Sequence, residues 1–196
     1  MNMWNWRNEW AIIRSSIPEW EGFVFSSELF WPLNFDREHE FSGGMKPRLS
    51  AGRLLIALFF IEFYQKQNFE IRNSVESDYL GIQKLKTDWK SNWQRKVNAE
   101  IPFRLRQWED IIGKVRKSSI SKAEFKSQLQ IRFMIDCLLL ESTMQIQQQF
   151  ETQLISLDQL LKMNTIEGEF VWDPEIISAF DPNKNWYLFC KLNTAG

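Results

Sequence analysis

The single histidine of the chain, His39, is the residue best suited to acid–base chemistry or metal binding near neutral pH. It lies in the run Arg37-Glu38-His39-Glu40, where an imidazole and two carboxylates could bind a metal ion together. A solvated polar loop accounts for the same residues. Because there is no second histidine, the chain contains no H-E-x-x-H motif and no pair of Glu-x-x-His motifs. We therefore expect no metal site and no cofactor.

Cys137 and Cys190 are the candidate sulfur nucleophiles. They stand 53 positions apart, neither belongs to a C-x-x-C unit, and no serine lies in a G-x-S-x-G turn. Cys137 precedes three leucines, which predicts a buried and unreactive thiol. This use of cysteine fits a reducing, cytoplasmic location.

Two pairs of carboxylates could act as an acid and a base, namely Glu167 with Glu169 and Asp173 with Glu175. The solvated face of a strand accounts for the first pair, and the start of a short helix accounts for the second. The chain also contains no glycine-rich phosphate-binding motif. An unrecognised enzyme is therefore only the third alternative for the function.

Positive charge is concentrated in the middle of the chain. Residues 84–132 carry a net charge of +8, whereas residues 1–41 carry −4 and residues 133–196 carry −6. One interpretation is a face that binds nucleic acid or another polyanion, because lysine and arginine neutralise phosphates. The other interpretation is that the acidic ends fold back and compensate the charge. The candidate polyanion-binding residues are Lys84, Lys86, Lys90, Arg95, Lys96, Arg104 and Arg106.

Aromatic residues are abundant, with 10 Trp, 16 Phe and 3 Tyr in 196 residues. Tryptophan is enriched in the centres of protein interfaces, so four tryptophans near the N-terminus are candidates for a protein-binding surface. The net charge of −4 over residues 1–41 argues against attraction to an anionic membrane. The alternative is that these side chains complete the core. They are Trp4, Trp6, Trp10 and Trp20.

The N-terminal half of the chain has the pattern of amphipathic and buried helices. Apolar residues from Trp6 to Ile17 recur at helical spacing, which predicts a first helix that ends before Pro18 and a short second helix that begins there. Glycine and proline predict a loop over residues 32–49. Ser50 is a candidate N-cap for a helix that is apolar nearly all round from residue 54 to residue 64. We expect that helix to be the central one.

A helical stripe of apolar residues continues from Ile82 to Val115 and is interrupted only by Pro102. We favour one kinked helix over two helices that meet at the proline. Ser121 and Glu124 have the spacing of a capping box for a helix over residues 122–163. The short connection predicts that these two long helices pack antiparallel.

The pattern changes after residue 164. Residues 167–172 and 186–192 are short aromatic and β-branched runs that predict two strands. Between them, Asp173 and Pro174 predict the start of a short helix, and Asp181 and Pro182 predict a turn. We expect a small β-hairpin that packs on the helices.

Three segments resemble a group of uncharacterised bacterial proteins. They are residues 30–33 (FWPL), residues 49–55 (LSAGRLL) and residues 169–175 (EFVWDPE), the last followed by residues 186–188 (WYL). These motifs are aromatic and structural. The resemblance implies a single helical domain and brings no activity, cofactor or site residue.

The sequence therefore predicts a mainly α fold in one domain over residues 1–196, helical to residue 164, with two long antiparallel helices, an apolar central helix and a C-terminal hairpin over 165–196. No apolar stretch approaches the roughly 20 residues that span a bilayer. We expect a non-enzymatic, cytoplasmic interaction or assembly protein that binds a protein partner or itself. Polyanion binding is the alternative.

Overall fold

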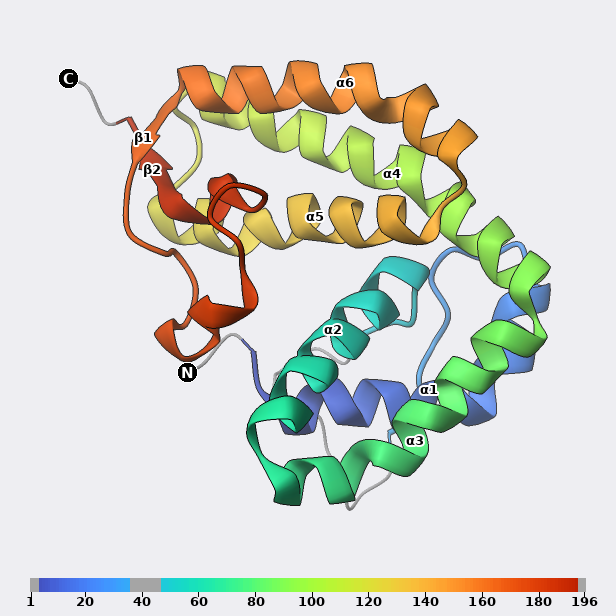
Figure 1. Ribbon diagram of the computed structural model, residues 1–196. Coiled ribbons are helices and arrows are strands. Elements are labelled where there is room, and N and C mark those ends of the chain that lie inside the picture. Colours follow the sequence, from blue (N-terminus) through green and yellow to red (C-terminus); the bar gives the residue numbers. More distant parts are fainter. Residues whose placement is uncertain (1–3, 36–46, 194–196) are drawn as a thin grey trace. The chain divides into compact units, whose positions relative to one another are not determined.

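The computed structural model describes residues 4–35 and 47–193 of the chain (Figure 1). It is mainly helical with a two-stranded antiparallel sheet near the C-terminus, which confirms the predicted fold class. The chain divides into two compact units, Asn2–Glu100 (the N-terminal unit) and Ile101–Gly196 (the C-terminal unit). The division falls inside a helix rather than in a loop. The single domain expected from the sequence stays a prediction.

Three helices of the N-terminal unit pack on one another: α1 (Trp6–Phe25), α2 (Ala51–Gln67) and α3 (Phe69–Asp88). Helix α2 is buried along most of its first three turns, which confirms the predicted apolar central helix. Its N-terminus is capped as expected, because the backbone N–H of Arg53 donates to Ser50 Oγ over 3.2 Å.

Helix α1 continues through Pro18, so the predicted break before this proline is wrong. A proline inside a helix removes one backbone hydrogen bond and costs about 3 kcal/mol. Side chains on both sides of Pro18 are buried, among them Ile13 and Trp20. Burial of this continuous apolar face outweighs the local cost, so the helix does not end there.

The long stripe predicted from Ile82 to Val115 is divided between α3 and α4 (Lys90–Arg116). The break is at Trp89, whose φ of −111° and ψ of 34° are not helical. Its side chain is 37% exposed and meets Phe25 edge-on, with ring centroids 5.0 Å apart, so it does not continue the buried stripe. Beyond this break, α4 runs through Pro102 as one helix.

The C-terminal unit contains α5 (Lys122–Glu141) and α6 (Met144–Met163), which run in opposite directions (Figure 1). The prediction of one helix over residues 122–163 is therefore wrong. Helix α5 ends at the turn formed by Ser142 and Thr143, because side chains there donate hydrogen bonds to a carbonyl group in its last turn. Ser142 Oγ and Gln147 Nε2 both donate to the carbonyl oxygen of Leu139, each over 2.8 Å.

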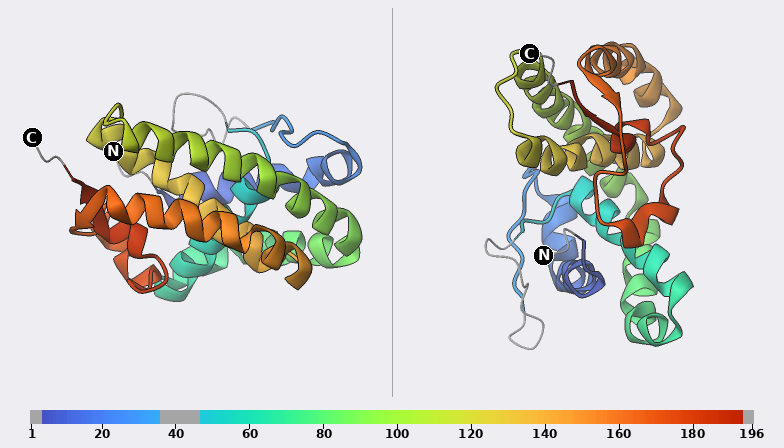
Figure 2. Two further views of the ribbon diagram at one scale, coloured as in Figure 1. Left: turned by 90° about the horizontal axis from the view of Figure 1, so that it is seen from above. Right: turned by 90° about the vertical axis from the view of Figure 1, so that its left-hand side faces the viewer.

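The predicted hairpin is present but shorter than expected. Strands β1 (Thr165–Glu167) and β2 (Cys190–Leu192) pair antiparallel, whereas η2 (Pro174–Ala179) and η3 (Trp186–Phe189) are 3-10 turns. Two aromatic residues between the strands, Trp172 and Phe180, pack on Phe133 of α5. Trp172 meets Phe133 edge-on with ring centroids 5.8 Å apart, and its indole N–H donates to the carbonyl of Lys126. Figure 2 shows this C-terminal segment against the α5 and α6 pair.

Burial of Trp108, which is 0% exposed, predicts a large loss of stability when it is truncated. We expect Trp108→Ala to lower the free energy of unfolding by about 3–5 kcal/mol, the range for removal of a buried aromatic side chain. Urea denaturation followed by circular dichroism measures this change. Trp89→Ala is the matched control and should cost far less, since Trp89 is partly exposed. Equal effects would contradict the packing described for α4.

Candidate interaction surface

The cations predicted to bind polyanions are distributed over both units and differ in exposure. Lys84, Lys90, Arg95 and Arg106 are exposed, whereas Lys86, Lys96 and Arg104 are buried. Lys84 forms an ion pair with Asp88 one turn further along α3. Polyanion binding by the exposed members stays a prediction.

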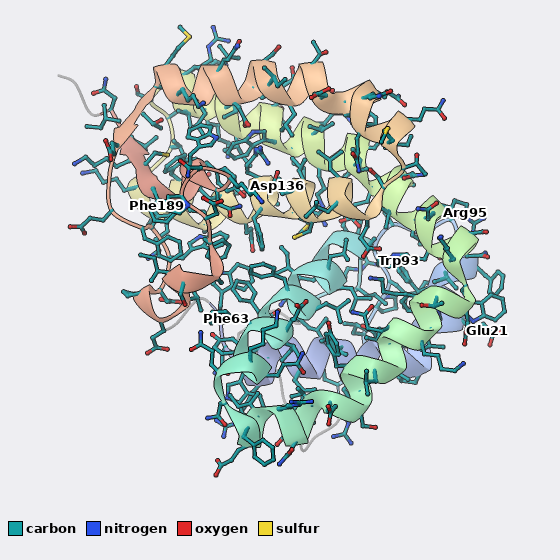
Figure 3. All side chains as sticks on the ribbon, in the orientation of Figure 1. Glu21, Phe63, Trp93, Arg95, Asp136 and Phe189 are labelled. Atoms are coloured by element: carbon teal, nitrogen blue, oxygen red, sulfur yellow. The ribbon has the colours of Figure 1, made fainter. Side chains whose placement is uncertain are left out.

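Two of these cations cap the C-terminal end of α1. Lys96 Nζ donates to Ser26 Oγ over 2.9 Å and to the carbonyl oxygen of Glu28 over 2.6 Å. Arg95 donates to the carbonyl oxygen of Val24 over 2.8 Å. Burial, followed by the nearby Arg95 charge, lowers the pKa of Lys96. In Figure 3, Trp93 points from α4 into the N-terminal unit, whereas Arg95 lies on the outer side of the helix.

A buried carboxylate of α4 binds the N-terminal end of a helix. Glu100 accepts hydrogen bonds from Ser50 Oγ over 2.8 Å and from the backbone N–H of Gly52 over 2.9 Å, at the N-terminus of α2. Negative charge is favoured at this position, because the first N–H groups of a helix lack backbone partners. The first turns of α4 thus fix an end of α1 with cations and an end of α2 with an anion.

The four tryptophans proposed as a protein interface are buried to different degrees. Trp4 and Trp20 are 5% and 2% exposed, so they belong to the core of the N-terminal unit. Trp6 and Trp10 are half-buried and stack with ring centroids 6.0 Å apart. The indole N–H of Trp10 donates to Asp78 over 2.7 Å, which fastens α1 to α3. Exposed aromatic surface in this group is therefore limited to Trp6 and Trp10.

A different surface, on α6, combines exposed apolar side chains with polar ones. The inner side of the helix buries Leu154, Leu157 and Leu161. The opposite side exposes six residues at steps of 4, 4, 3, 4 and 4, which we call the α6 outer stripe. Its members are Met144, Gln148, Thr152, Ile155, Gln159 and Met163.

Three side chains of the α6 outer stripe are large, apolar and open to solvent. Met144 is 72% exposed, Ile155 is 50% exposed and Met163 is 76% exposed. The six members are uncharged, but Lys162, which is exposed two turns after Ile155, lies on the same side of the helix. The sequence analysis missed this stripe because it followed the buried face of the helix. The apolar residues Met144, Ile155 and Met163 on the opposite face were the signal that could have identified it.

A buried charge network determines which side of α6 faces outward. Arg132 of α5 donates from Nε and Nη2 to both carboxylate oxygens of Asp158 on α6, over 2.9 and 2.8 Å. The same guanidinium also pairs with Asp136, one turn further along α5. Because Arg132 is only 5% exposed, loss of either acidic partner would leave a buried charge without full compensation.

The network extends to the C-terminal segment. The hydroxyl of Tyr187 in η3 donates to Asp136 over 2.6 Å, and Asn185 Nδ2 donates to that hydroxyl over 3.2 Å. Arg132 also lies 4.8 Å from the centroid of the Tyr187 ring. Figure 3 shows Asp136 on α5 and Phe189, two residues after Tyr187, in the segment that packs on it. One arginine thus joins α5, α6 and η3.

The titration behaviour of these groups favours a structural role. Burial, reinforced by the Asp136 charge, raises the pKa of Tyr187 well above its ordinary value. Burial also raises the pKa of Asp136, while Arg132 and Tyr187 oppose that shift. The thiols behave alike, since burial raises the pKa of Cys137 strongly and the pKa of Cys190 to about 11. Both thiols therefore remain protonated near neutral pH, in agreement with the burial expected for Cys137.

A pocket of about 430 Å³ lies beside the sheet and η3. Its walls include Ile166, Trp186 and Phe189, and its charged residues are Lys162 and Glu167. Lys162 Nζ lies 4.7 Å from the Trp186 ring centroid, so this cation already has an aromatic partner. Within residues 4–35 and 47–193, no three His, Cys, Asp or Glu side chains are grouped to hold a metal ion. The proposed histidine loop around His39 lies outside these residues.

Comparisons of the chain with models of protein families, with curated proteins and with solved structures found no match. The resemblance to uncharacterised bacterial proteins stays a prediction. Among the helices in the described part of the chain, none combines the length and hydropathy that a membrane span requires.

The raised pKa of Tyr187 gives a test of the network. Tyr187→Phe removes a hydrogen bond to a carboxylate and should cost about 1.5–3 kcal/mol of stability at neutral pH. A raised folded-state pKa stabilises the wild type fully below the unfolded-state value near 10, and this contribution is lost as the pH rises above that value. The difference in unfolding free energy between wild type and variant should therefore shrink above pH 10.

Urea denaturation between pH 7 and pH 11 measures this difference. Tyr64→Phe, in the N-terminal unit, controls for the removal of a tyrosine hydroxyl as such. If the difference in unfolding free energy between wild type and Tyr187→Phe stayed constant from pH 7 to pH 11, this would contradict the raised pKa of Tyr187.

Proposed function

We propose that the protein is a non-enzymatic interaction or assembly protein that binds a protein partner through the α6 outer stripe. The observation that carries this proposal is the exposure of Met144, Ile155 and Met163 along the outer side of one helix. Single exposed apolar residues are common, but several aligned on one helix face are typical of binding surfaces.

The rigidity of α6 supports the same proposal. A binding helix must hold its contact face in one orientation, because ordering a loose segment on binding reduces affinity. The leucines on the inner side of α6 and the bidentate contact between Arg132 and Asp158 provide that orientation. The polar groups of this network are engaged with one another, so their arrangement favours support of the helix over catalysis.

A lysine at the centre of the stripe should abolish binding. The partner is the protein, either a second copy of the chain or a different protein, that co-purifies and cross-links with the native wild type. We expect Ile155→Lys to abolish this interaction, because binding would move an unpaired charge out of water. Mass spectrometry of the cross-linked native protein measures this loss and locates the contact on α6.

Leu80→Lys is the matched control, since Leu80 is 59% exposed on α3 and lies in the other unit. It should retain the interaction, and circular dichroism should show that both variants are folded. If Ile155→Lys kept every cross-link of the wild type, α6 would not be the contact surface.

One observation supports the second candidate, single-stranded nucleic acid. Trp89 and Phe25 form an exposed aromatic pair in the N-terminal unit, and Lys90 and Arg95 are exposed nearby along α4. Exposed rings can stack on bases while cations neutralise phosphates. Glu21 and Glu28 are also exposed at this end of α1, which opposes the attraction.

This candidate predicts a salt-dependent affinity. The logarithm of the binding constant should fall by about 0.7 for each neutralised phosphate per logarithmic unit of salt. Fluorescence anisotropy with a labelled single-stranded oligonucleotide measures that slope. Lys90→Gln should flatten it and Trp89→Ala should weaken binding at every salt concentration, whereas Leu80→Lys should do neither. Affinity that is insensitive to salt would exclude this use of the basic residues.

A further inference from the structure

The pocket of about 430 Å³ beside the sheet and η3 has the composition of a site for a small ligand. Such sites are mostly apolar with a few polar groups, and their volumes start at roughly 300 Å³. Trp186 and Phe189, both half-buried, and Ile166, which is 47% exposed, are its large apolar residues. A ligand bound there would cover apolar surface that is open to water in the free protein.

Two opposite charges line this pocket without neutralising each other. Lys162 of α6 and Glu167 of β1 are both exposed. Within residues 4–35 and 47–193, neither side chain forms an ion pair or a hydrogen bond, with the other or with any further residue. Exposed cations on α3 behave differently, since Arg72 and Lys84 each pair with an acidic residue one turn away.

The position of Lys162 is fixed by an aromatic contact that leaves its hydrogen atoms available. Its ammonium lies over the Trp186 ring, 4.7 Å from the ring centroid. A contact with a ring face uses none of the three N–H donors of a lysine in a conventional hydrogen bond. The ammonium can therefore bind an anionic group of a ligand while it stays over the ring.

The pair of charges limits the ligands that fit. Lys162 would repel a ligand that carries only a positive charge, and it already occupies the position over Trp186 that such a ligand would seek. Glu167 would repel a ligand that carries only a negative charge. A ligand that carries one charge of each sign can pair with both residues, and an apolar part of that ligand can contact the aromatic walls.

We propose that this pocket binds a free α-amino acid with an aromatic or large aliphatic side chain. The carboxylate of the amino acid pairs with Lys162, its ammonium pairs with Glu167, and its side chain lies against Trp186 and Phe189. The proposal goes beyond the proposed function, because it concerns a small ligand and does not depend on a protein partner at the α6 outer stripe.

Isothermal titration calorimetry with L-phenylalanine and L-leucine tests the proposal. Wild-type protein should bind at least one of them saturably at millimolar concentration. N-acetyl-L-phenylalanine keeps only the negative charge and L-phenylalaninamide keeps only the positive charge. Each should bind about tenfold more weakly than L-phenylalanine, which corresponds to one lost hydrogen bond to a charged group. No binding of either amino acid, or equal binding of both analogues and L-phenylalanine, would overturn the proposal.

Two variants assign the charges of the ligand to their partners. Lys162→Gln should bind L-phenylalanine about tenfold more weakly and no longer prefer it to the amide. Glu167→Gln should lose the preference over the N-acetyl analogue instead. Both residues are exposed, so circular dichroism should show that both variants are folded. A variant that kept the affinity and the preference of wild type would refute the role of the residue it replaces.

Matched controls in the same unit are Lys184→Gln and Glu169→Gln. These residues are exposed but do not line the pocket, so both variants should bind like wild type. A loss of affinity in the controls as large as that in Lys162→Gln and Glu167→Gln would show a general effect of charge and refute the site.

Nuclear magnetic resonance of isoleucine methyl groups locates the ligand. L-phenylalanine, or L-leucine if only that amino acid binds, should shift the methyl signal of Ile166, which the variant Ile166→Val identifies by its absence. The signal of Ile155 should stay in place, because this equally exposed isoleucine lies outside the pocket. A shift of Ile155 without a shift of Ile166 would place the ligand elsewhere and refute the proposal.

Discussion

The contact between Arg132 and Asp158 is the constraint on which the proposed surface depends. A guanidinium that is 5% exposed must be paired, and two oxygens of one carboxylate bind it in the fork geometry that arginine favours. Rotation of α6 about its own axis would break this pairing. Asp158 and the buried leucines Leu154, Leu157 and Leu161 fix the inner side of α6, so the side that carries the outer stripe faces solvent. Burial of the Arg132 charge thus contributes to which side of the helix is exposed.

The N-terminal unit uses charge in a different way. Its first turns of α4 supply Arg95 to the carbonyl group of Val24 in the last turn of α1 and Glu100 to the N–H group of Gly52 at the start of α2. Each charge meets the helix end whose partial charge is opposite to its own. Part of the basic segment that the sequence presents as a binding face therefore has a structural role. Lys86, Lys96, Arg104 and Arg132 are buried, so the net charge of +8 over residues 84–132 overstates the positive charge that this segment exposes.

Patterns carried by neighbouring residues were sufficient to predict much of the fold. The apolar run of α2, the N-caps at Ser50 and Ser121 and the C-terminal strands all follow from local sequence. The errors at Pro18, Trp89 and Ser142 concern helix ends, where the balance between a local signal and distant packing decides the outcome. At Pro18, burial of the apolar side chains in the second half of α1 outweighs the cost of the proline, so the helix continues. At Ser142, hydrogen bonds from side chains cap the end of α5, although the apolar pattern continues beyond it. The pairing of Arg132 with Asp158, 26 positions away, has no local signature.

The uncharged stripe itself illustrates why surface function is harder to predict than a core. A buried face is selected for apolar character, which periodicity detects, whereas a contact face of this kind mixes methionine, isoleucine, glutamine and threonine. Such a face remains soluble alone because its amides and hydroxyl bind water, and it still has apolar side chains to bury on contact. A stripe of leucines at the same positions would bury more apolar area on contact. It would also expose a large apolar surface, prone to nonspecific association, whenever the helix had no partner. The mixed composition of the α6 outer stripe is therefore compatible with the proposed role, in which the helix is hydrated when free and buried when bound.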